Sequence, residues 1–400
     1  MSNPPPQSQP EIIRRRAVFL LPGYDPAPPR RYREIYRSEA VRQAEITGRQ
    51  VQLTAAERPA PFYGWQTRAV QNDSATQTEF WLLPWNDLVR NSMRAGVFGI
   101  YRIAGRTALS YIAGGAFLAL LRLRWQPMLA VLFPLAILFG QLVVATVALR
   151  VGALLGGLTG LGMAAIMCYA AADWLRKQDN RFYTYYLLHL YAFVAHNAAQ
   201  PQPELAQRMA ALADAVQAAL DDGVDEVLIV GHSLGAQIAV DVVGDMLRAG
   251  RLQGPGHVGV LTLGQVIPMM SFLPAAKQLR RNLNTLAASP RIFWLDVSSQ
   301  ADGGCFALAD PVAVTGVAPP HAYGPKVISA AFAETVENAQ GQRFFDRHFQ
   351  YFRAFTHPEN YDYFAITAGA KPLAARFEAR NNSPQINQKT YSKQTDMADA

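Results

Sequence analysis

One serine in this 400-residue chain has the neighbours that a catalytic nucleophile requires. The sequence GHSLG at residues 231–235 follows an apolar run at 227–230 and precedes an amphipathic stretch at 237–247. A serine hydroxyl is a weak nucleophile until it is held in a constrained position beside a base. A sharp strand-to-helix turn presents it in this way, and small residues two positions before and after it let the turn close. The pattern predicts Ser233 as a nucleophile, with a plain structural turn as the alternative.

The stretch VLIVGHSLGAQIA at 227–239 resembles the nucleophile elbow of α/β-hydrolase lipases and esterases. Gly231, His232 and Gly235 are the elbow residues around Ser233. Residues 262–264 (TLG) are similar to the next strand of that family. The resemblance covers much of the chain in outline and is specific only around the serine.

The resemblance implies an acid in a loop after a later strand, and a histidine after the acid. The predicted strand at 291–297 still contains Asp296, whereas Asp302 lies just beyond it. Asp302 is therefore favoured as the acid. Asp310, before Pro311, is the second candidate and could equally cap a turn.

Chain order leaves three histidines for the role of base. His348 is favoured because aromatic residues flank it and it lies at a predicted loop-to-helix transition. His321 follows two prolines close to the acid loop, and His357 precedes Pro358, so both remain alternatives.

The resemblance also implies an oxyanion hole after the first strand, which here is the Pro22-Gly23-Tyr24 turn. The backbone N–H groups of Tyr24 and Leu234 would face the developing oxyanion. A proline stands where the family commonly has histidine, although backbone donors do not need that side chain. The implied chemistry is two-step acyl transfer through an acyl-enzyme, without a metal or redox cofactor.

Short apolar runs alternate with amphipathic stretches along the chain and predict an α/β fold. We expect a mostly parallel sheet flanked by helices, of the α/β-hydrolase type. The predicted strands are 17–21, 51–55, 76–85, 227–230, 258–263 and 291–297, and the predicted helices are 31–47, 204–220 and 237–247.

A block without acidic residues, at 111–172, interrupts this pattern. Two uncharged runs within it, about 127–149 and 151–172, are each long enough to cross the roughly 30 Å core of a bilayer as a helix. Arg150 and Gly152 mark the expected turn of a helical transmembrane hairpin. A segment at about 107–124 is expected to lie in the membrane interface. The alternative is a buried helical pair in a soluble protein.

The net charge of +7 points to an anionic lipid membrane rather than to nucleic acid. Basic residues gather on both sides of the hairpin, which places both flanks and the globular part on the cytoplasmic side. The two cysteines, Cys168 and Cys305, have no metal-ligand spacing and fit a reducing compartment. The gathered basic residues are Arg94, Arg102, Arg106, Arg122, Arg124, Arg176, Lys177 and Arg181.

The predicted organisation is a disordered N-terminus at 1–13, a first part of the domain at 14–92, a membrane insertion at 93–180, a second part at 181–380 and a disordered tail at 381–400. The favoured function is an esterase or lipase that cleaves lipid or amphiphilic acyl esters near a membrane. An acyltransferase with the same triad and an inactive membrane-bound scaffold are the alternatives. The oligomeric state is left open.

Overall fold

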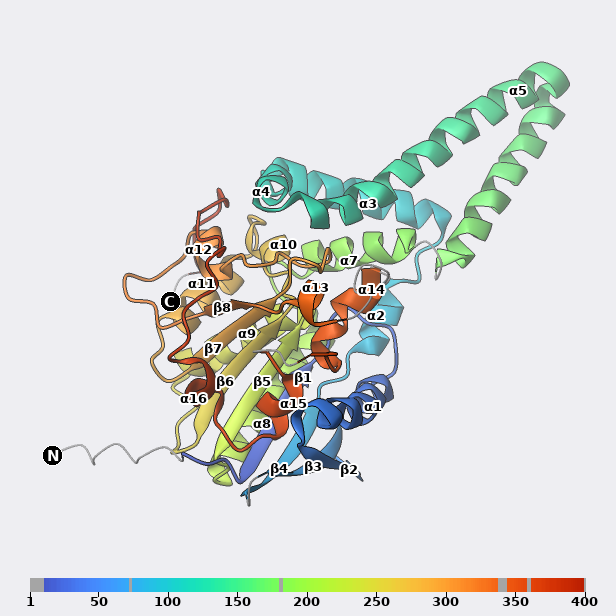
Figure 1. Cartoon of the computed structure of the whole chain (residues 1–400). Helices are drawn as coiled ribbons and strands as arrows, with labels where there is room; N and C mark the ends of the chain where they lie inside the picture. Colours follow the sequence, from blue (N-terminus) through green and yellow to red (C-terminus); the bar gives the residue numbers. More distant parts are fainter. Residues whose placement is uncertain (1–10, 72–73, 180–182, 337–343, 358–360, 399–400) are drawn as a thin grey trace.

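A computed structural model describes residues 11–71, 74–179, 183–336, 344–357 and 361–398. Residues 1–10 of the predicted disordered N-terminus lie outside these ranges, as does Arg181 from the basic cluster. The described chain forms an α/β domain from which a long helical arm projects (Figure 1).

The strands form one eight-stranded, mostly parallel sheet in the order β2-β3-β4-β1-β5-β6-β7-β8. β1 is parallel to β4 and β5, and the parallel pairing continues from β5 to β8. β3 is antiparallel to both of its neighbours, β2 and β4. The strands are β1 Arg15–Leu21, β2 Gln50–Ala56, β3 Tyr63–Gln71, β4 Ser74–Leu82, β5 Glu226–His232, β6 His257–Leu263, β7 Phe293–Ser298 and β8 Lys326–Ser329.

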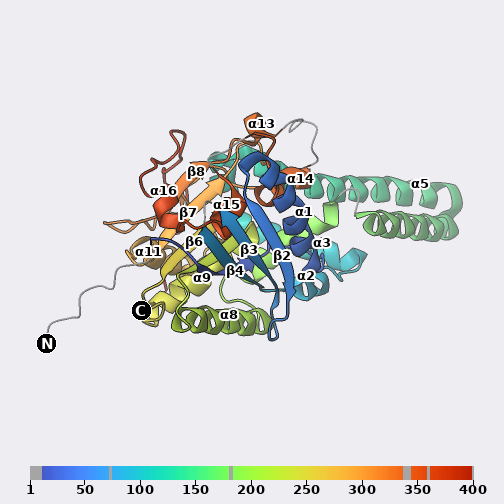
Figure 2. The same cartoon turned by 60° about the horizontal axis from the view of Figure 1, so that its bottom comes forward.

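Helices cover both faces of this sheet (Figures 1 and 2). α8, α9 and α11 pack on one face, and α1, α15 and α16 pack on the other. The helices are α1 Arg30–Thr47, α2 Asn86–Ser92, α3 Val97–Ala113, α4 Ala116–Leu123, α5 Trp125–Lys177, α7 Thr184–His196, α8 Pro203–Asp221, α9 Leu234–Arg248, α10 Pro268–Ser271, α11 Lys277–Ala287, α12 Pro311–Thr315, α13 Phe332–Thr335, α14 Phe344–His348, α15 Tyr363–Ala368 and α16 Leu373–Phe377, and the 3-10 helix η2 is Gln350–Phe352.

The central strands are apolar throughout because both of their faces are covered. Phe19 and Leu21 of β1 belong to one hydrophobic core, and Val18 and Leu20 belong to the other. Such continuous apolar runs are typical of parallel strands with helices on both sides. These runs made the strands recognisable in the sequence. The predicted strands at 17–21, 227–230 and 258–263 are confirmed.

The strands β3 and β8 were not predicted, because neither has a clear strand pattern in its sequence. β3 (YGWQTRAVQ) mixes polar and apolar residues and lies next to β2, the edge strand of the sheet. β8 has only four residues, which is too short for a periodic signal. The predicted helices at 31–47, 204–220 and 237–247 are confirmed as α1, α8 and α9, with α9 beginning three residues earlier.

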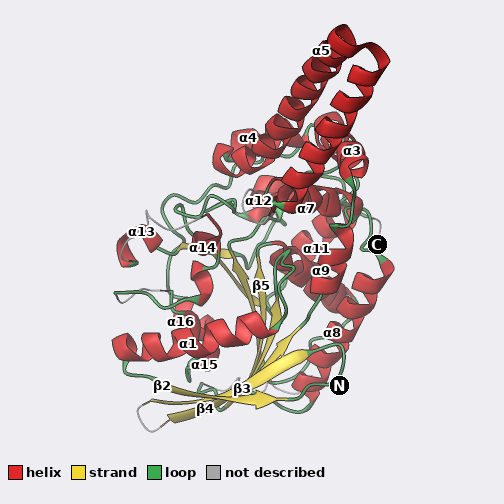
Figure 3. Ribbon diagram, turned by 90° about the vertical axis from the view of Figure 1, so that its right-hand side faces the viewer, coloured by secondary structure: helices red, strands yellow, loops and turns green. Residues whose placement is uncertain are grey.

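The insertion between β4 and β5 contains a helical hairpin that projects away from the domain (Figure 3). Both arms belong to α5, which is broken at Gly157, where φ is +55° and ψ is −135°. Glycine tolerates this conformation because it has no Cβ. The arms touch at Gly152 and Gly160, since a Cβ on Gly160 would lie 2.1 Å from the carbonyl oxygen of Gly152.

The turn of the hairpin lies later in the chain than the sequence predicted. Arg150 and Gly152 were expected at the turn, but both lie within the first arm, and the break falls at Gly157. A single arginine in an apolar helix does not end it, whereas a positive-φ glycine does. The predicted interfacial segment at 107–124 is divided between α3 and α4.

α5 is the one described helix that is long and apolar enough by itself to cross a membrane. Its most apolar 18-residue window has a mean hydropathy of 2.4, and 17% of that window is buried. Apolar side chains such as Leu154, Leu155 and Leu158 are more than four-fifths exposed. α3 and α4, bent by 77° relative to each other, pass the same test only as a pair.

The tail, predicted to be disordered from residue 381, follows the surface of the domain as far as residue 398. The N–H of Asn387 donates to the carbonyl oxygen of Leu308 at 2.7 Å, and that of Tyr391 donates to Val314 at 2.9 Å. Asp396 forms ion pairs with Lys277 and Arg280 at 2.9 Å. These long-range bonds hold a segment that has no helical or strand periodicity of its own.

A buried ion pair joins β1, β5 and the chain before α16. Arg16 Nε donates to Glu226 Oε2 at 2.6 Å, and neither side chain is more than 1% exposed. The guanidinium also donates to the carbonyl oxygens of Gly369 and Lys371, while Glu226 Oε1 accepts from the N–H of Leu373. The pair thus fixes the C-terminal segment to the two central strands.

Arg16→Met should destabilise the protein by about 3–5 kcal/mol because it leaves the Glu226 carboxylate buried without its partner. The double variant Arg16→Met/Glu226→Gln should be less destabilised, since the amide oxygen still accepts from Leu373 and no charge is left unpaired. Urea denaturation in detergent measures both free energies of unfolding. A double variant less stable than the single variant would contradict this account.

Candidate active site

Ser233 occupies a strained turn between β5 and α9. Its φ is +55° and its ψ is −121°, a conformation that residues with a Cβ rarely adopt. The N–H of Ser233 donates to the carbonyl oxygen of Leu263 at the end of β6, at 2.9 Å. The turn therefore lies at the carboxyl edge of the sheet, where the ends of the parallel strands meet.

Three glycines allow this turn to form. A Cβ on Gly231 would lie 2.5 Å from Ala236 Cα, and a Cβ on Gly235 would lie 2.1 Å from the carbonyl oxygen of Leu21. Gly23, after β1, faces the serine itself, since its Cβ would lie 2.9 Å from Ser233 Cβ. The steric reason predicted for Gly231 and Gly235 is confirmed, and Gly23 extends it to the first strand.

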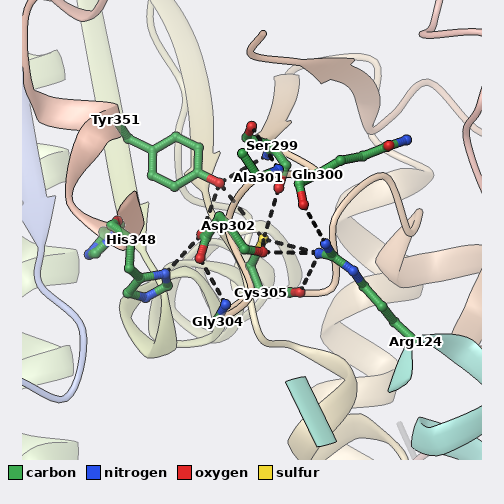
Figure 4. Close-up of polar contacts among 10 residues, drawn as sticks. Arg124, Ser299, Gln300, Ala301, Asp302, Gly304, Cys305, His348 and Tyr351 are labelled. Carbon is green, nitrogen blue, oxygen red and sulfur yellow. Dashed lines mark hydrogen bonds and ion pairs between the residues drawn. The ribbon is translucent and has the colours of Figure 1, made fainter. Parts of the chain in front are cut away.

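Asp302 and His348 form a hydrogen-bonded pair beside this turn (Figure 4). His348 Nδ1 lies 2.9 Å from Asp302 Oδ2, and both side chains are buried. Asp302 comes from the loop after β7, and His348 ends α14. With Nδ1 facing the carboxylate, Nε2 is the ring nitrogen left to exchange a proton.

Further donors converge on the Asp302 carboxylate. The Tyr351 hydroxyl donates to Oδ2 at 3.0 Å, and the Gly304 N–H donates to Oδ1 at 2.8 Å. Burial alone would raise the pKa of Asp302, but the charge and hydrogen bond of His348 and the Gly304 N–H lower it to about 2. Asp302 is therefore ionised at neutral pH.

His232, the residue before the serine, supports the other side of His348. Its Nε2 lies 2.8 Å from the carbonyl oxygen of His348, and the two rings are 4.7 Å apart. Burial and the neighbouring His348 lower the pKa of His232 to about 3. His232 is therefore a neutral imidazole that can donate to this carbonyl and fix the end of α14.

The helical insertion contacts the loop after β7, which carries Asp302, through Arg124. This arginine lies in the break between α4 and α5. Its guanidinium donates to the carbonyl oxygens of Asp302 at 3.1 Å, Cys305 at 2.8 Å and Gln300 at 2.8 Å (Figure 4). Arg124 was predicted as a basic residue beside the membrane. The structure places its guanidinium against the backbone of the loop that carries Asp302.

A cavity of about 380 Å³ joins the serine and the histidine. Ser233, His348, His232 and Tyr24 line it, together with apolar residues of α5 and α7. Within the described part of the chain, Ser233 Oγ and His348 form no hydrogen bond with each other. They share one cavity and are not in hydrogen-bonding contact.

The other predicted candidates lie elsewhere. Asp310 caps the helix α12, where it accepts from the N–H groups of Val312 and Ala313; its structural role is that of a helix cap and not of the turn cap that was the alternative. His321 and His357 are exposed and do not line the cavity. Of the predicted acids and late histidines, the structure brings together only Asp302 and His348.

Two backbone amides of the site have no acceptor within the described residues. The N–H of Tyr24 follows the Pro22-Gly23 turn, and the N–H of Leu234 begins α9. The close approach of Gly23 to Ser233 brings these two turns together. They are the amides that the sequence analysis expected at an oxyanion hole.

Tyr351 is a side chain of the candidate site that was not predicted from the sequence. It is fully buried, donates to Asp302, and accepts from the N–H of Ser299 at 3.0 Å. It lies three residues after His348, so proximity to the histidine was the only available signal.

No family model, curated protein or solved structure matches this chain. The fold of the described chain is an eight-stranded, mostly parallel sheet with flanking helices. This arrangement is compatible with an α/β-hydrolase-like fold.

Gly235→Ala should destabilise the domain by about 1–3 kcal/mol or more, because the new methyl group would overlap the backbone of β1. Gly105→Ala is the matched control: Gly105 is exposed within α3 and has nothing within 4 Å of a Cβ. The control should stabilise the helix by up to about 1 kcal/mol. Urea unfolding in detergent compares them, and equal stabilities would contradict the packing described for the turn.

Proposed function

We propose that this chain is a membrane-anchored serine hydrolase of the α/β-hydrolase type. In this proposal it cleaves carboxylic esters of lipid or amphiphilic molecules through an acyl-enzyme. The observation that carries the proposal is the buried Asp302–His348 pair, whose histidine lines the same cavity as a serine on a strained, glycine-framed turn.

In the first step, His348 Nε2 takes the proton of Ser233 while Oγ attacks the ester carbonyl carbon. Asp302 holds the imidazole through Nδ1 and stabilises the imidazolium. The Tyr24 and Leu234 amides donate to the oxyanion. As the bond to the alcohol oxygen breaks, His348 returns the proton to the leaving alcohol, and Ser233 carries the acyl group.

In the second step, His348 takes a proton from water, and the resulting hydroxide attacks the acyl carbon. The bond to Ser233 Oγ breaks, and the serine recovers its proton from His348. Hydrogen bonds of this kind are often long in ligand-free sites and tighten when substrate binds. We therefore expect the Ser233–His348 contact to close in the complex.

The Asp302–His348 contact favours an enzyme over an inactive scaffold. A scaffold would need no carboxylate that is buried and kept ionised beside an imidazole, because burying such a charge is costly. Three donors nonetheless hold the Asp302 carboxylate in this state. Hydrolysis and acyl transfer differ only in the acceptor, and we propose water.

Ser233→Ala should abolish labelling by a fluorophosphonate, because the probe forms its bond with the nucleophilic oxygen. His348→Ala and Asp302→Asn should slow labelling by about 10²–10⁴-fold. Ser110→Ala, in α3, serves as the control and should label like the unaltered protein. In-gel fluorescence measures the rates. Labelling that persists in Ser233→Ala would exclude this nucleophile.

The membrane part of the proposal rests on the exposed apolar arms of α5. Arg176 and Lys177 lie at the base of the second arm, and Arg122 and Arg124 lie at the base of the first. Because basic residues at both bases favour the cytoplasmic side, we propose that the bases of the arms and the α/β domain lie there.

A reporter that is active only outside the cytoplasm should give a signal when inserted between Gly156 and Gly157. The same reporter after residue 398 should give none, since the domain would lie on the cytoplasmic side. Reporter activity in intact cells measures both. A cytoplasmic result at both positions would remove the transmembrane hairpin.

A further inference from the structure

A second cavity, of about 230 Å³, lies among the helices of the insertion and α7. Ala108 of α3, Leu120 of α4, Val131 of α5 and Leu188 of α7 contribute to its walls. The lining is almost entirely hydrocarbon. Such a surface offers no compensation for a charged or strongly polar ligand, whereas dry apolar cavities accept hydrocarbon.

This cavity adjoins the one that contains Ser233. Tyr191 lines both. The first turns of α5 line both as well, with Pro127 and Ala130 on the serine side and Val131 on the other. Tyr111 packs edge-on against Tyr191, with ring centres 5.9 Å apart.

The second cavity also lies at the root of the hairpin. Leu132 and Leu135 of α5 line it, and the exposed Phe139 and Leu142 follow in the same arm. The same arm of α5 therefore contributes apolar side chains both to the cavity and to the exposed surface beyond it. An apolar cavity of about 150 Å³ can hold a benzene molecule, so this one has room for a longer hydrocarbon chain.

We propose that the second cavity binds the acyl chain of the substrate, with Tyr191 at the junction to the catalytic cavity. The carbonyl would then lie beside Ser233 and the polar leaving group near Asp25 and Arg31, which line the other side of the first cavity. This proposal rests on the proposed hydrolase function, and it adds a preference for long, unbranched acyl chains.

Filling and enlarging the cavity should shift chain-length preference in opposite directions. Ala108→Trp places an indole in the cavity, and Val131→Ala enlarges it. Leu109→Trp is the matched control, because Leu109 is the next residue of α3 and is 67% exposed. The readouts are hydrolysis of p-nitrophenyl acetate and dodecanoate in micelles, and binding of dansyl-undecanoic acid by fluorescence.

In Ala108→Trp, we expect kcat/KM for dodecanoate to fall at least tenfold while that for acetate stays within twofold. Binding of dansyl-undecanoic acid should weaken in parallel. Val131→Ala should raise the ratio of dodecanoate to acetate activity, which a misfolded variant would not do. The control should match the unaltered protein.

Equal losses on both esters in Ala108→Trp, or equal effects in the control, would overturn the acyl-chain site. The same holds if Ala108→Trp binds dansyl-undecanoic acid as tightly as the unaltered protein. Failure of the proposed hydrolase function is distinguishable, because it would appear as no Ser233-dependent hydrolysis of either ester. The binding comparison would then still decide whether the cavity holds an alkyl chain.

Discussion

The close approach of β1 to the first turn of α9 is the constraint on which the site depends. Gly235 lies against the carbonyl oxygens of Leu21 and Pro22, so the helix can begin only where the first strand ends. Ser233 is thereby held with a positive φ at the edge of the sheet, and Gly23 leaves space for its side chain. The turn itself is strained, and the packing of the neighbouring central strands stabilises it in this conformation.

Asp302 and His348, the proposed acid and base, are held by contacts that come from distant parts of the chain. Asp302 follows β7, yet its carboxylate is fixed by Tyr351 and His348 from a later segment. His232 fixes the carbonyl oxygen of His348 from the serine turn itself. One hydrogen-bond network therefore joins the end of β5 to the loop that carries Asp302. A shift in the position of either segment would alter the contacts of the other.

The sequence predicted the parts of this arrangement that are local. The elbow at 231–235 and the strands β1, β5 and β6 follow from apolar runs and glycine spacing within a few residues. Asp302 and His348 could be selected as candidates from their order along the chain and from their neighbouring residues. The hydrogen bond between them could not be predicted from the sequence. Tyr351, the capping role of Asp310 and the course of the tail depend on long-range hydrogen bonds, which leave no periodic signal. The turn at Gly157 depends on one backbone conformation among several glycines.

Arg124 ties the backbone of the acid loop to the base of the helical arm. The arm is stiff, because helices resist bending, and its base is held where α4 meets α5. The base of the arm also packs against α3, α4 and α7. The loop that carries Asp302 and the inserted helices therefore share one guanidinium group, and replacement of Arg124 would leave three carbonyl oxygens of that loop without this donor.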